Sequence, residues 1–216
     1  MATVTGLGAK SHKFTPGEHL FHQGDADRGI HRIVRGTVTV YRVTSDGYRQ
    51  IEAFAGPGDY ASLCLSSTSP TSAQALSEVE TEYVGRADFE RRLLEDAAFR
   101  AEVFREIDKA SADARRQATL LACRCAMERV AAFVLFLDTH FAPGADGFVP
   151  IPMSRCEMAD HLGLTLETVS RMLNRLKRNG VIALPRPDRF QILNLHRLAT
   201  LSGDALDETS PRREAI

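Results

Sequence analysis

The sequence contains few cysteines and no long apolar segment, and both shortages narrow the class of protein. Its four cysteines, Cys64, Cys123, Cys125 and Cys156, are too few and too scattered to form a disulfide framework. No apolar run reaches the roughly 18 residues that suggest a membrane-spanning helix. The first residues, MATVTGLGAKSHKF, lack the apolar core of a signal peptide. We therefore expect a cytoplasmic protein.

The sequence also lacks the residue patterns of an active site. It contains no recognisable pair of nucleophile and base, no triad of metal ligands and no glycine-rich phosphate loop. We therefore expect a protein that is not an enzyme. Its 216 residues, 44% of them hydrophobic and 25% charged, are enough for one large or two modest globular domains.

Basic residues are concentrated in one segment of a chain whose formal net charge is only −1. Residues 151–200 contain eight Lys and Arg against four Asp and Glu, whereas residues 1–150 contain 17 against 20. A local excess of positive charge suits a nucleic-acid-binding surface, but such segments are usually solvated surface. The charge alone therefore leaves both interpretations open.

Residues 14–86 have the pattern of several short strands separated by glycine turns. The segment TVTVYRV alternates with a period of two, which is typical of a strand with one buried face. It runs into SDG, where Asp46 and Gly47 suit a tight hairpin turn. This spacing predicts a small antiparallel barrel or sandwich.

From Phe99 onward, apolar residues recur every three or four positions, which predicts an amphipathic helix of about 25 residues. Asp88 and Asp96 are suitable helix caps in this region. The apolar seam of the long helix is narrow and rich in alanine, which favours self-association through paired helices. The alternative is packing against the chain's own barrel. The predicted seam residues are Val103, Ile107, Ala110, Ala114 and Leu121.

After a second, more apolar helix and a Gly/Pro-rich break, residues 155–174 fit a helix-turn-helix position by position. Ser154 and Glu157 form the S-x-x-E capping box that opens the first helix. Gly163 supplies the backbone freedom of the turn, and Thr165 is placed to cap the second helix. The alternative is a helical hairpin with no role in DNA binding. Small or apolar residues occupy the buried positions of the motif: Met158, Ala159, Leu162, Leu164, Val169 and Met172.

The second helix of this motif carries Glu167, Ser170 and Arg171 on one face near its N-terminal end. That part of a recognition helix reaches base edges in the major groove. There an arginine donates two hydrogen bonds to guanine, and a carboxylate accepts one from the cytosine amino group. Glu167 also lies four residues before Arg171 and is placed to orient its guanidinium. We therefore expect these three residues to read the bases.

Other polar residues of the basic segment are interpreted as contacts with the DNA backbone or as solvated charge. The segment VIALPRPDRFQILNL predicts two short strands around PRPD, the shape of a wing, whose arginines are placed to touch the backbone. For each arginine the alternative is a role in surface solubility. The candidate phosphate contacts are Arg155, Thr168, Arg175, Lys177, Arg178, Arg186 and Arg189.

The whole arrangement resembles the CRP–FNR family of bacterial transcription regulators over about residues 14–200. The resemblance rests on FTPGEHLFHQGD, IVRGTVTVYR, GPGDY, the long helix and MSRCEMADHLGLTLETVSR. It implies an α+β fold that begins with a double-stranded β-roll, like that of cyclic-nucleotide-binding domains, over residues 14–96. A dimerisation helix over 97–122 and a winged helix-turn-helix over 126–200 would follow, and residues 201–216 would form a flexible tail.

Within the family, LETVSR resembles the FNR/FixK branch, in which E-x-x-S-R reads a palindrome with TTGA-type half-sites. CRP-like members have Arg and Gly at the positions of Leu166 and Ser170, which argues against CRP-type site choice. The resemblance implies a homodimer that places two recognition helices in successive major grooves about 34 Å apart.

The resemblance also implies how the protein acts on transcription. The loop of Ser45, Asp46 and Gly47 occupies the place where FNR-like activators touch RNA polymerase, so we expect an activator. FixK-like proteins typically switch on genes for low-oxygen respiration or nitrogen fixation.

Departures from the family's patterns predict that no cofactor is bound. Cyclic-nucleotide binders hold ribose and phosphate with a Glu and an Arg-Ser pair, but Leu63 and Thr71 stand where the Glu and Arg should be. A threonine cannot replace a bidentate phosphate clamp, so cAMP binding is not expected. FNR holds an iron–sulfur cluster with a group of N-terminal cysteines and one more cysteine after the segment that corresponds to AQAL. Residues 1–63 of this chain contain no cysteine, so four thiolate ligands cannot be assembled in that way. The alternative is a ligand- or haem-gated sensor on the same scaffold, with His19 and His22 as haem or metal candidates.

Cys156 is a candidate redox thiol. It lies at the second position of the capped helix beside Arg155, and a helix N-terminus and a cation both favour the thiolate. Our hypothesis is that its oxidation adds charge or bulk near DNA phosphates and weakens binding; the alternative is an inert small residue. Cys123 and Cys125, one residue apart with no paired histidine after them, are not expected to bind metal. We expect Cys64 in the core.

Overall fold

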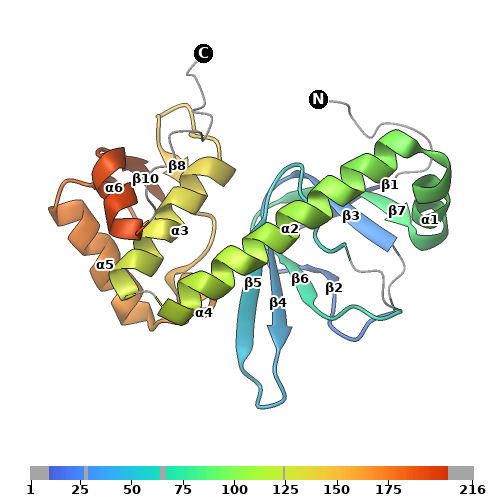
Figure 1. The fold of residues 1–216 in the computed structure, drawn as a ribbon, viewed down its shortest axis with the longest axis horizontal. Helices are drawn as coiled ribbons and strands as arrows, with labels where there is room; N and C mark the ends of the chain where they lie inside the picture. The colour runs from blue at the N-terminus through green and yellow to red at the C-terminus, as the bar shows by residue number, and fades with distance from the viewer. Residues whose placement is uncertain (1–9, 27–28, 64–66, 124, 204–216) are drawn as a thin grey trace. The chain divides into compact units, whose positions relative to one another are not determined.

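The computed structural model describes residues 10–26, 29–63, 67–123 and 125–203 (Figure 1). The chain divides into two compact units, residues 1–118 and 119–216. Within the described residues, no helix has both the length and the apolar character needed to cross a membrane. Of the tail expected over residues 201–216, the first two residues belong to the last helix, and 204–216 lie outside the described part, as does Cys64.

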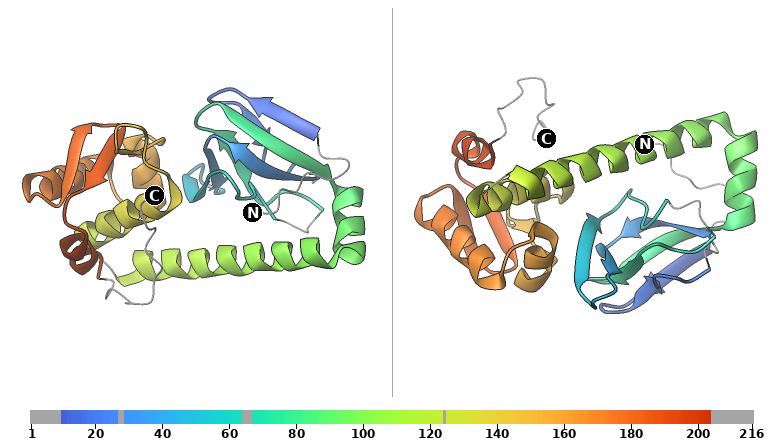
Figure 2. Two further views of the ribbon diagram at one scale, coloured as in Figure 1. Left: turned by 90° about the horizontal axis from the view of Figure 1, so that it is seen from above. Right: turned by 60° about the horizontal axis from the view of Figure 1, so that its bottom comes forward.

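The first unit contains a roll of two antiparallel sheets, as the family resemblance implied (Figure 2). One sheet has the order β1 (Lys10–Phe14), β7 (Val79–Gly85), β3 (Gly29–Arg35). The other has the order β2 (His19–Phe21), β6 (Ser72–Ala75), β4 (Val38–Val43), β5 (Arg49–Ala55). Because side chains alternate along a strand, one face of each sheet supplies the interior. That interior contains Ile33, Val38, Ala55, Ala61, Ala73, Ala75 and Val79.

The hairpin between β4 and β5 confirms the turn predicted at Asp46 and Gly47. Gly47 has a φ of +81°, a left-handed conformation that glycine adopts without steric cost. The N–H of Thr44 donates to the carbonyl of Tyr48 at 2.9 Å, and the Thr44 hydroxyl donates to the Asp46 carboxylate. The loop over residues 45–48 is exposed.

Two helices, α1 (Arg86–Glu95) and α2 (Ala97–Cys123), follow the roll in the chain. The predicted long helix is confirmed. Asp96 caps it, because its carboxylate accepts hydrogen bonds at 3.0 Å from two N–H groups in the first turn of α2. The cap predicted at Asp88 is wrong: Asp88 is the third residue of α1, and Gly85 is the residue that precedes this helix.

One face of α2 packs against the roll of its own unit. Val103 is 3% exposed and lies in an apolar cluster with Ile30, Phe89 and Phe99. Its place in the predicted dimer seam is therefore wrong, because its side chain is already buried within the chain. The alternative of packing against the roll holds for this face of the helix.

A different face of α2 remains uncovered. Phe104 is 60% exposed and Ile107 is 37% exposed, and Ala110 and Ala114 are also exposed, whereas Leu121 is half-buried. The uncovered apolar and small residues recur with alternating steps of three and four. They are Phe104, Ile107, Ser111, Ala114, Ala118 and Leu121, of which Ser111 and Leu121 are half-buried.

The second unit is a winged helix-turn-helix. After the end of α2 it contains α3 (Ala126–His140), β8 (Val149–Pro150), α4 (Arg155–Leu162), α5 (Leu166–Arg178), β9 (Ile182–Arg186), β10 (Arg189–Ile192) and α6 (Leu195–Ser202). The strands form one sheet of order β8–β10–β9, and α3 packs against α5 and α6. Burial of each large apolar side chain contributes roughly 1.5–3 kcal/mol. Those at most 1% exposed include Leu137, Met158, Leu162, Leu176, Ile182, Phe190 and Leu198.

Candidate nucleic-acid interface

The helix-turn-helix forms through the local bonds that the sequence predicted. The hydroxyl of Ser154 accepts from the N–H of Glu157 at 3.2 Å, and the Glu157 carboxylate accepts from the N–H of Ser154 at 2.8 Å. Gly163 ends α4 with a φ of +59°, and its N–H donates to the carbonyl of Ala159. Thr165 caps α5 by accepting from the third N–H of that helix at 3.2 Å. The predicted caps and turn are therefore confirmed.

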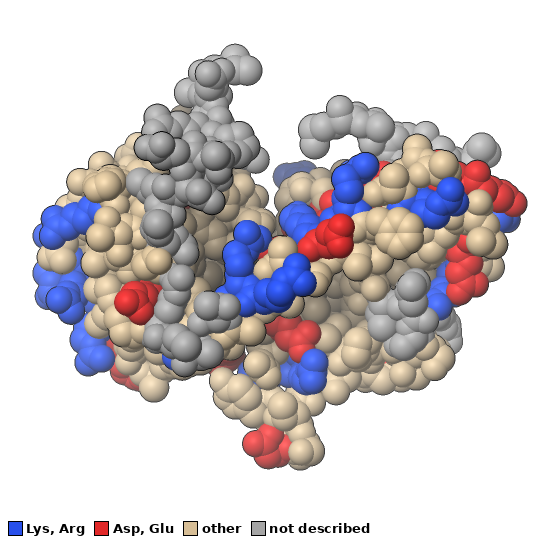
Figure 3. All heavy atoms as spheres, in the orientation of Figure 1, with Lys and Arg blue, Asp and Glu red and all other residues tan. Residues whose placement is uncertain are grey.

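One face of α5 is buried and the other is polar. Val169, Met172, Leu173 and Leu176 are each at most 8% exposed, at the i, i+3, i+4 and i+7 spacing of a helix face. The predicted buried positions Met158, Ala159 and Leu162 of α4 are also in the core, and Leu164 is half-buried. The remaining polar side chains of α5 are turned outward, and Figure 3 shows Lys and Arg gathered over this helix. Those that are exposed are Glu167, Arg171, Asn174, Arg175, Lys177 and Arg178; Ser170 is half-buried.

Glu167 lies at the second position of α5, where its charge interacts favourably with the helix N-terminus. Its own backbone N–H and then the Thr165 hydroxyl hold the pKa of the carboxyl below its ordinary value. The carboxylate is therefore ionised at neutral pH. Within the described residues it forms no ion pair with Arg171, and its expected role in orienting that guanidinium stays a prediction.

The basic side chains of α5 are not engaged inside the protein. Within the described part of the chain, no ion pair or hydrogen bond involves the side chains of Arg171, Arg175, Lys177 or Arg178. Thr168, another predicted phosphate contact, is half-buried, and its hydroxyl lies 3.1 Å from that of Thr165. The four cations are thus available to an external anion.

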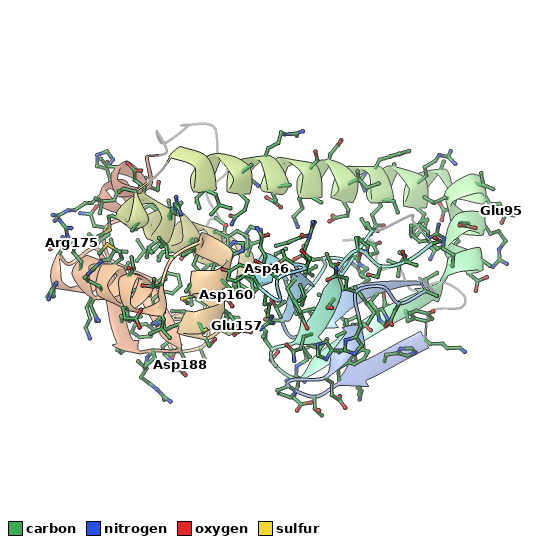
Figure 4. The ribbon with its side chains drawn as sticks, turned by 90° about the horizontal axis from the view of Figure 1, so that it is seen from below. Asp46, Glu95, Glu157, Asp160, Arg175 and Asp188 are labelled. Carbon is green, nitrogen blue, oxygen red and sulfur yellow. The ribbon has the colours of Figure 1, made fainter. Side chains whose placement is uncertain are left out.

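The predicted wing is the hairpin of β9 and β10, and its arginines are paired. Arg189 donates to the carboxylate of Asp146 at 2.5 Å and lies 3.4 Å from that of Asp188. Arg186 lies 3.6 Å from Asp188, which is labelled in Figure 4 together with Arg175 of α5. Asp146 is 43 residues away from Arg189 in the chain, so no local sequence pattern indicates this pair.

Arg155 is held within the unit. It is half-buried, it donates to the carbonyl of Pro187 at 3.0 Å, and it lies 3.2 Å from the sulfur of Met158. Burial lowers the pKa of its guanidinium. In the DNA-free chain Arg155 therefore anchors the wing turn to α4, a tertiary contact that spacing in the sequence could not reveal.

Arg129 on α3 is a second residue that the sequence pattern did not single out. One guanidinium nitrogen donates to the carbonyls of Leu162 and Gly163 at 3.1 and 3.3 Å, and the other to that of Leu121 at 2.8 Å. These carbonyls belong to the end of α4, the turn and the end of α2. Arg129 therefore links α3 to the turn of the helix-turn-helix and to the end of α2 through hydrogen bonds.

Two of the four cysteines, Cys125 and Cys156, have side chains that the structure describes. Cys156 is exposed at the second position of α4, as predicted from the sequence. Cys125 is also exposed and precedes α3, where its N–H donates to the Glu128 carboxylate at 2.8 Å. The side chain of Cys123 lies outside the described residues. The described His, Cys, Asp and Glu side chains form no group of three suited to a metal ion.

The roll of the first unit contains a cavity of about 440 Å³. Phe14, Phe21 and Tyr83 line it together with His31, which is 7% exposed and lies 3.0 Å from the Thr81 hydroxyl. Burial lowers the pKa of His31 to about 4, so the imidazole is neutral at pH 7. The described residues that line the cavity include no Lys or Arg.

Four residues that were considered for ligand binding lie outside the lining of this cavity. Two of them were expected to exclude a cyclic nucleotide, and the other two are the histidines considered for haem. Leu63 packs against the apolar cluster beside α2, and Thr71 is 5% exposed. His19 and His22 stack on each other with ring centroids 4.2 Å apart, and His19 lies 2.8 Å from the Tyr41 hydroxyl. Neither histidine lines the cavity.

Comparisons with known proteins agree with both units. The Crp-like helix-turn-helix domain matches residues 128–201, and the cyclic nucleotide-binding domain matches residues 11–96. The nitrogen fixation regulation protein FixK of Bradyrhizobium diazoefficiens is 38% identical, over 82% of this chain and 76% of the relative. The FixK of Rhizobium meliloti is 32% identical, over 87% of this chain and 85% of the relative.

A solved structure supports the same assignment. The structure of FixK2 from Bradyrhizobium japonicum superposes with a TM-score of 0.85 at 32% identity, and covers 92% of this chain and 98% of that chain. The predicted roll, long helix and winged helix-turn-helix are all confirmed. The chain belongs to the FNR/FixK branch of the CRP–FNR family and is a DNA-binding transcription regulator.

Proposed function

We propose that this regulator binds a TTGA-N6-TCAA-like palindrome and that Glu167, Ser170 and Arg171 of α5 read its bases. The observation that carries the proposal is the exposed polar face of α5, where a carboxylate, a hydroxyl and a guanidinium lie at positions i, i+3 and i+4. The guanidinium is unpaired among the described residues, so it is available for a bidentate bond to guanine.

An ionised carboxylate on this face favours base recognition over simple attraction. Phosphates repel Glu167, so its presence lowers affinity unless it accepts a hydrogen bond from a base such as cytosine. Arg175, Lys177 and Arg178 lie toward the other end of α5 and supply the contacts with phosphates. The helix therefore separates selection of sequence from general attraction.

We also propose that the regulator is a homodimer. The uncovered stripe of α2, from Phe104 to Leu121, has the alternating three- and four-residue steps of a coiled-coil seam. It replaces the seam predicted through Val103, which is buried in its own unit. A palindromic site fits such a dimer, because two-fold symmetry presents one recognition helix to each half-site.

The names of the relatives support a role in low-oxygen or nitrogen-fixation control and in activation. Two of them are nitrogen fixation regulation proteins, and the transcriptional activator protein FnrA of Stutzerimonas stutzeri is 33% identical over 88% of this chain and 80% of the relative. We propose that the β4–β5 loop with Ser45, Asp46 and Gly47 contacts RNA polymerase. The Thr44 hydroxyl, followed by backbone N–H groups, lowers the pKa of Asp46, so the loop presents a negative charge.

We propose further that no cofactor is needed for DNA binding. The uncharged Thr71 supports this for cAMP, because it is 5% exposed and stands where cyclic-nucleotide binders carry the arginine that clamps the phosphate. A ligand-gated regulator is the second candidate function. The cavity itself favours that candidate, since its aromatic lining and neutral His31 suit a small uncharged molecule.

Titration of the purified chain on the palindromic duplex tests these proposals. We expect the bare protein to bind the palindrome at least tenfold more tightly than a duplex of scrambled sequence, and added cAMP to change neither affinity. Binding that appears only after cell extract is added would favour the ligand-gated candidate. Mapping of bound genomic sites would then identify the controlled genes.

The exposed thiol of Cys156 remains a proposed redox switch. Its place in the first turn of α4, the helix that precedes the recognition helix, puts an added charge near the DNA backbone. We expect peroxide to weaken DNA binding by the wild type and to leave Cys156→Ala unaffected. Equal losses in both proteins would contradict the proposal.

A further inference from the structure

The two arginines of the wing face two carboxylates, Asp188 in the wing turn and Asp146 in the loop that precedes β8. Asp146 and Asp188 face Arg186 and Arg189, so the group has no net charge. A bond from the backbone N–H of Phe148 is the largest cause that lowers the pKa of Asp146, and the Arg189 side chain lowers that of Asp188 most. Both carboxylates are therefore ionised at neutral pH.

Hydrogen bonds to the backbone position both partners of the closest pair, Arg189 and Asp146. The Asp146 carboxylate accepts from the N–H of Phe148 at 3.1 Å, which fixes it in the loop that precedes β8. On the other side, Arg155 donates to the carbonyl of Pro187, and the N–H of Ile151 donates to that of Asp188 at 2.7 Å. The wing turn is therefore positioned so that Arg189 meets Asp146 before any DNA is present.

We propose that Asp146 acts as an electrostatic latch that keeps Arg189 from the DNA backbone. A carboxylate and a phosphate both bind the planar fork of a guanidinium, so they compete for the same donors. While Arg189 is bound to Asp146, the wing adds little to the affinity for DNA of any sequence. Sequence choice is then left to α5, whose cations have no such partner.

Because the pair is partly exposed, it can be broken without unfolding the domain. The Arg189 and Asp146 side chains are 35% and 43% exposed, and ion pairs at the surface contribute little to stability. Loss of the Asp146 charge should therefore free Arg189 from its closer carboxylate, with only Asp188 left at 3.4 Å, and leave the fold unchanged. This inference rests on the proposed function, because it requires that the wing approach DNA together with α5.

The test is Asp146→Asn, which keeps the size of the side chain and removes its charge. Affinity would be measured on the palindrome and on a random-sequence duplex across a range of salt concentrations. One added phosphate contact in each protomer steepens the slope of log affinity against log salt by about 0.9 per protomer, which corresponds to roughly two- to tenfold tighter binding per protomer near 0.1 M salt. We expect this gain on both duplexes.

Two further variants make the result specific. Arg189→Ala alone should change affinity less than twofold, because that arginine is already occupied, and adding it to Asp146→Asn should abolish the gain. Glu95→Gln removes one negative charge from the exposed end of α1 in the other unit and serves as the matched control. We expect this control to keep the wild-type slope of log affinity against log salt. We expect the midpoint of thermal unfolding to be unchanged for every variant.

Two results would overturn the latch. The first is an unchanged slope or weaker binding by Asp146→Asn at an unchanged thermal midpoint. The second is a loss of about 0.9 in slope per protomer in Arg189→Ala alone, which would mean that this arginine already contacts phosphate. Because the random-sequence duplex reports on the latch even if the palindrome is not the natural site, failure of the proposed base recognition is distinguished from failure of the latch.

Discussion

The recognition helix and the wing both contain arginines that the sequence marked as candidate DNA contacts, but the structure gives them different surroundings. On α5, the side chains of Arg171, Arg175 and Arg178 have no partner among the described residues, whereas Arg186 and Arg189 of the wing face carboxylates. Net charge along the sequence counts these arginines equally. The comparison teaches that pairing within the fold decides which of them can attract DNA.

The largest effect is expected from the unpaired arginine near the start of α5. Arg171→Ala should weaken binding to the palindrome by about 1–3 kcal/mol and relax discrimination at one guanine, because the bidentate donor is lost. Competition binding against half-sites with each base changed in turn measures both. An equal loss on every sequence would make Arg171 a phosphate contact and remove the distinction between the two ends of α5.

A smaller and different effect is expected from the last turn of α5. Lys177→Ala should weaken binding several-fold on all sequences alike and lower the salt slope by about 0.9 per protomer, since each protomer loses one phosphate contact. Salt titration on specific and random duplexes is the measurement. A change in base preference, with the slope unaltered, would contradict the assignment of this end of the helix to attraction.

Substitution of Arg155 tests whether this residue anchors the wing turn or contacts a DNA phosphate. Arg155→Ala should lower the free energy of unfolding by about 1 kcal/mol, because the carbonyl of Pro187 loses its charged donor. Thermal or urea unfolding followed by circular dichroism would record this. If stability is unchanged and the salt slope falls by about 0.9 per protomer, Arg155 belongs with the cations of α5 instead.

The smallest effect is expected at the second carboxylate of the wing. Asp188→Asn should tighten DNA binding by less than Asp146→Asn, because Asp188 lies 3.4 Å from Arg189 and 3.6 Å from Arg186 and is itself 49% exposed. The same salt titration applies. A larger gain than that of Asp146→Asn would show that Asp188 is the main restraint on the wing.

Sequence reasoning succeeded where the determining bonds are local. The Ser154 and Glu157 capping box, the turn at Gly163 and the cap at Thr165 each depend on residues within a few positions of one another. Helical periodicity identified the buried face around Val169 for the same reason. These features predicted the helix-turn-helix and the position of the residues that we propose read the bases.

The sequence could not supply contacts between distant positions. Val103 fits an apolar seam by spacing, but which side of the helix faces the roll depends on Ile30 and Phe89, far away in the chain. The pair of Asp146 and Arg189 likewise spans 43 positions. Periodicity places a residue on a face, and only the tertiary fold decides what covers that face.

Glu167 is the one acidic side chain on the exposed face of α5, and we propose that it selects the sequence to which the basic residues of this helix bind. The most direct measurement compares wild type and Glu167→Ala on the palindrome, on palindromes changed at the base pair whose cytosine it contacts, and on random DNA. We predict that the variant loses about tenfold or more of the wild type's discrimination at that pair, while its affinity for random DNA is equal or higher. Unchanged discrimination at every pair would contradict the account.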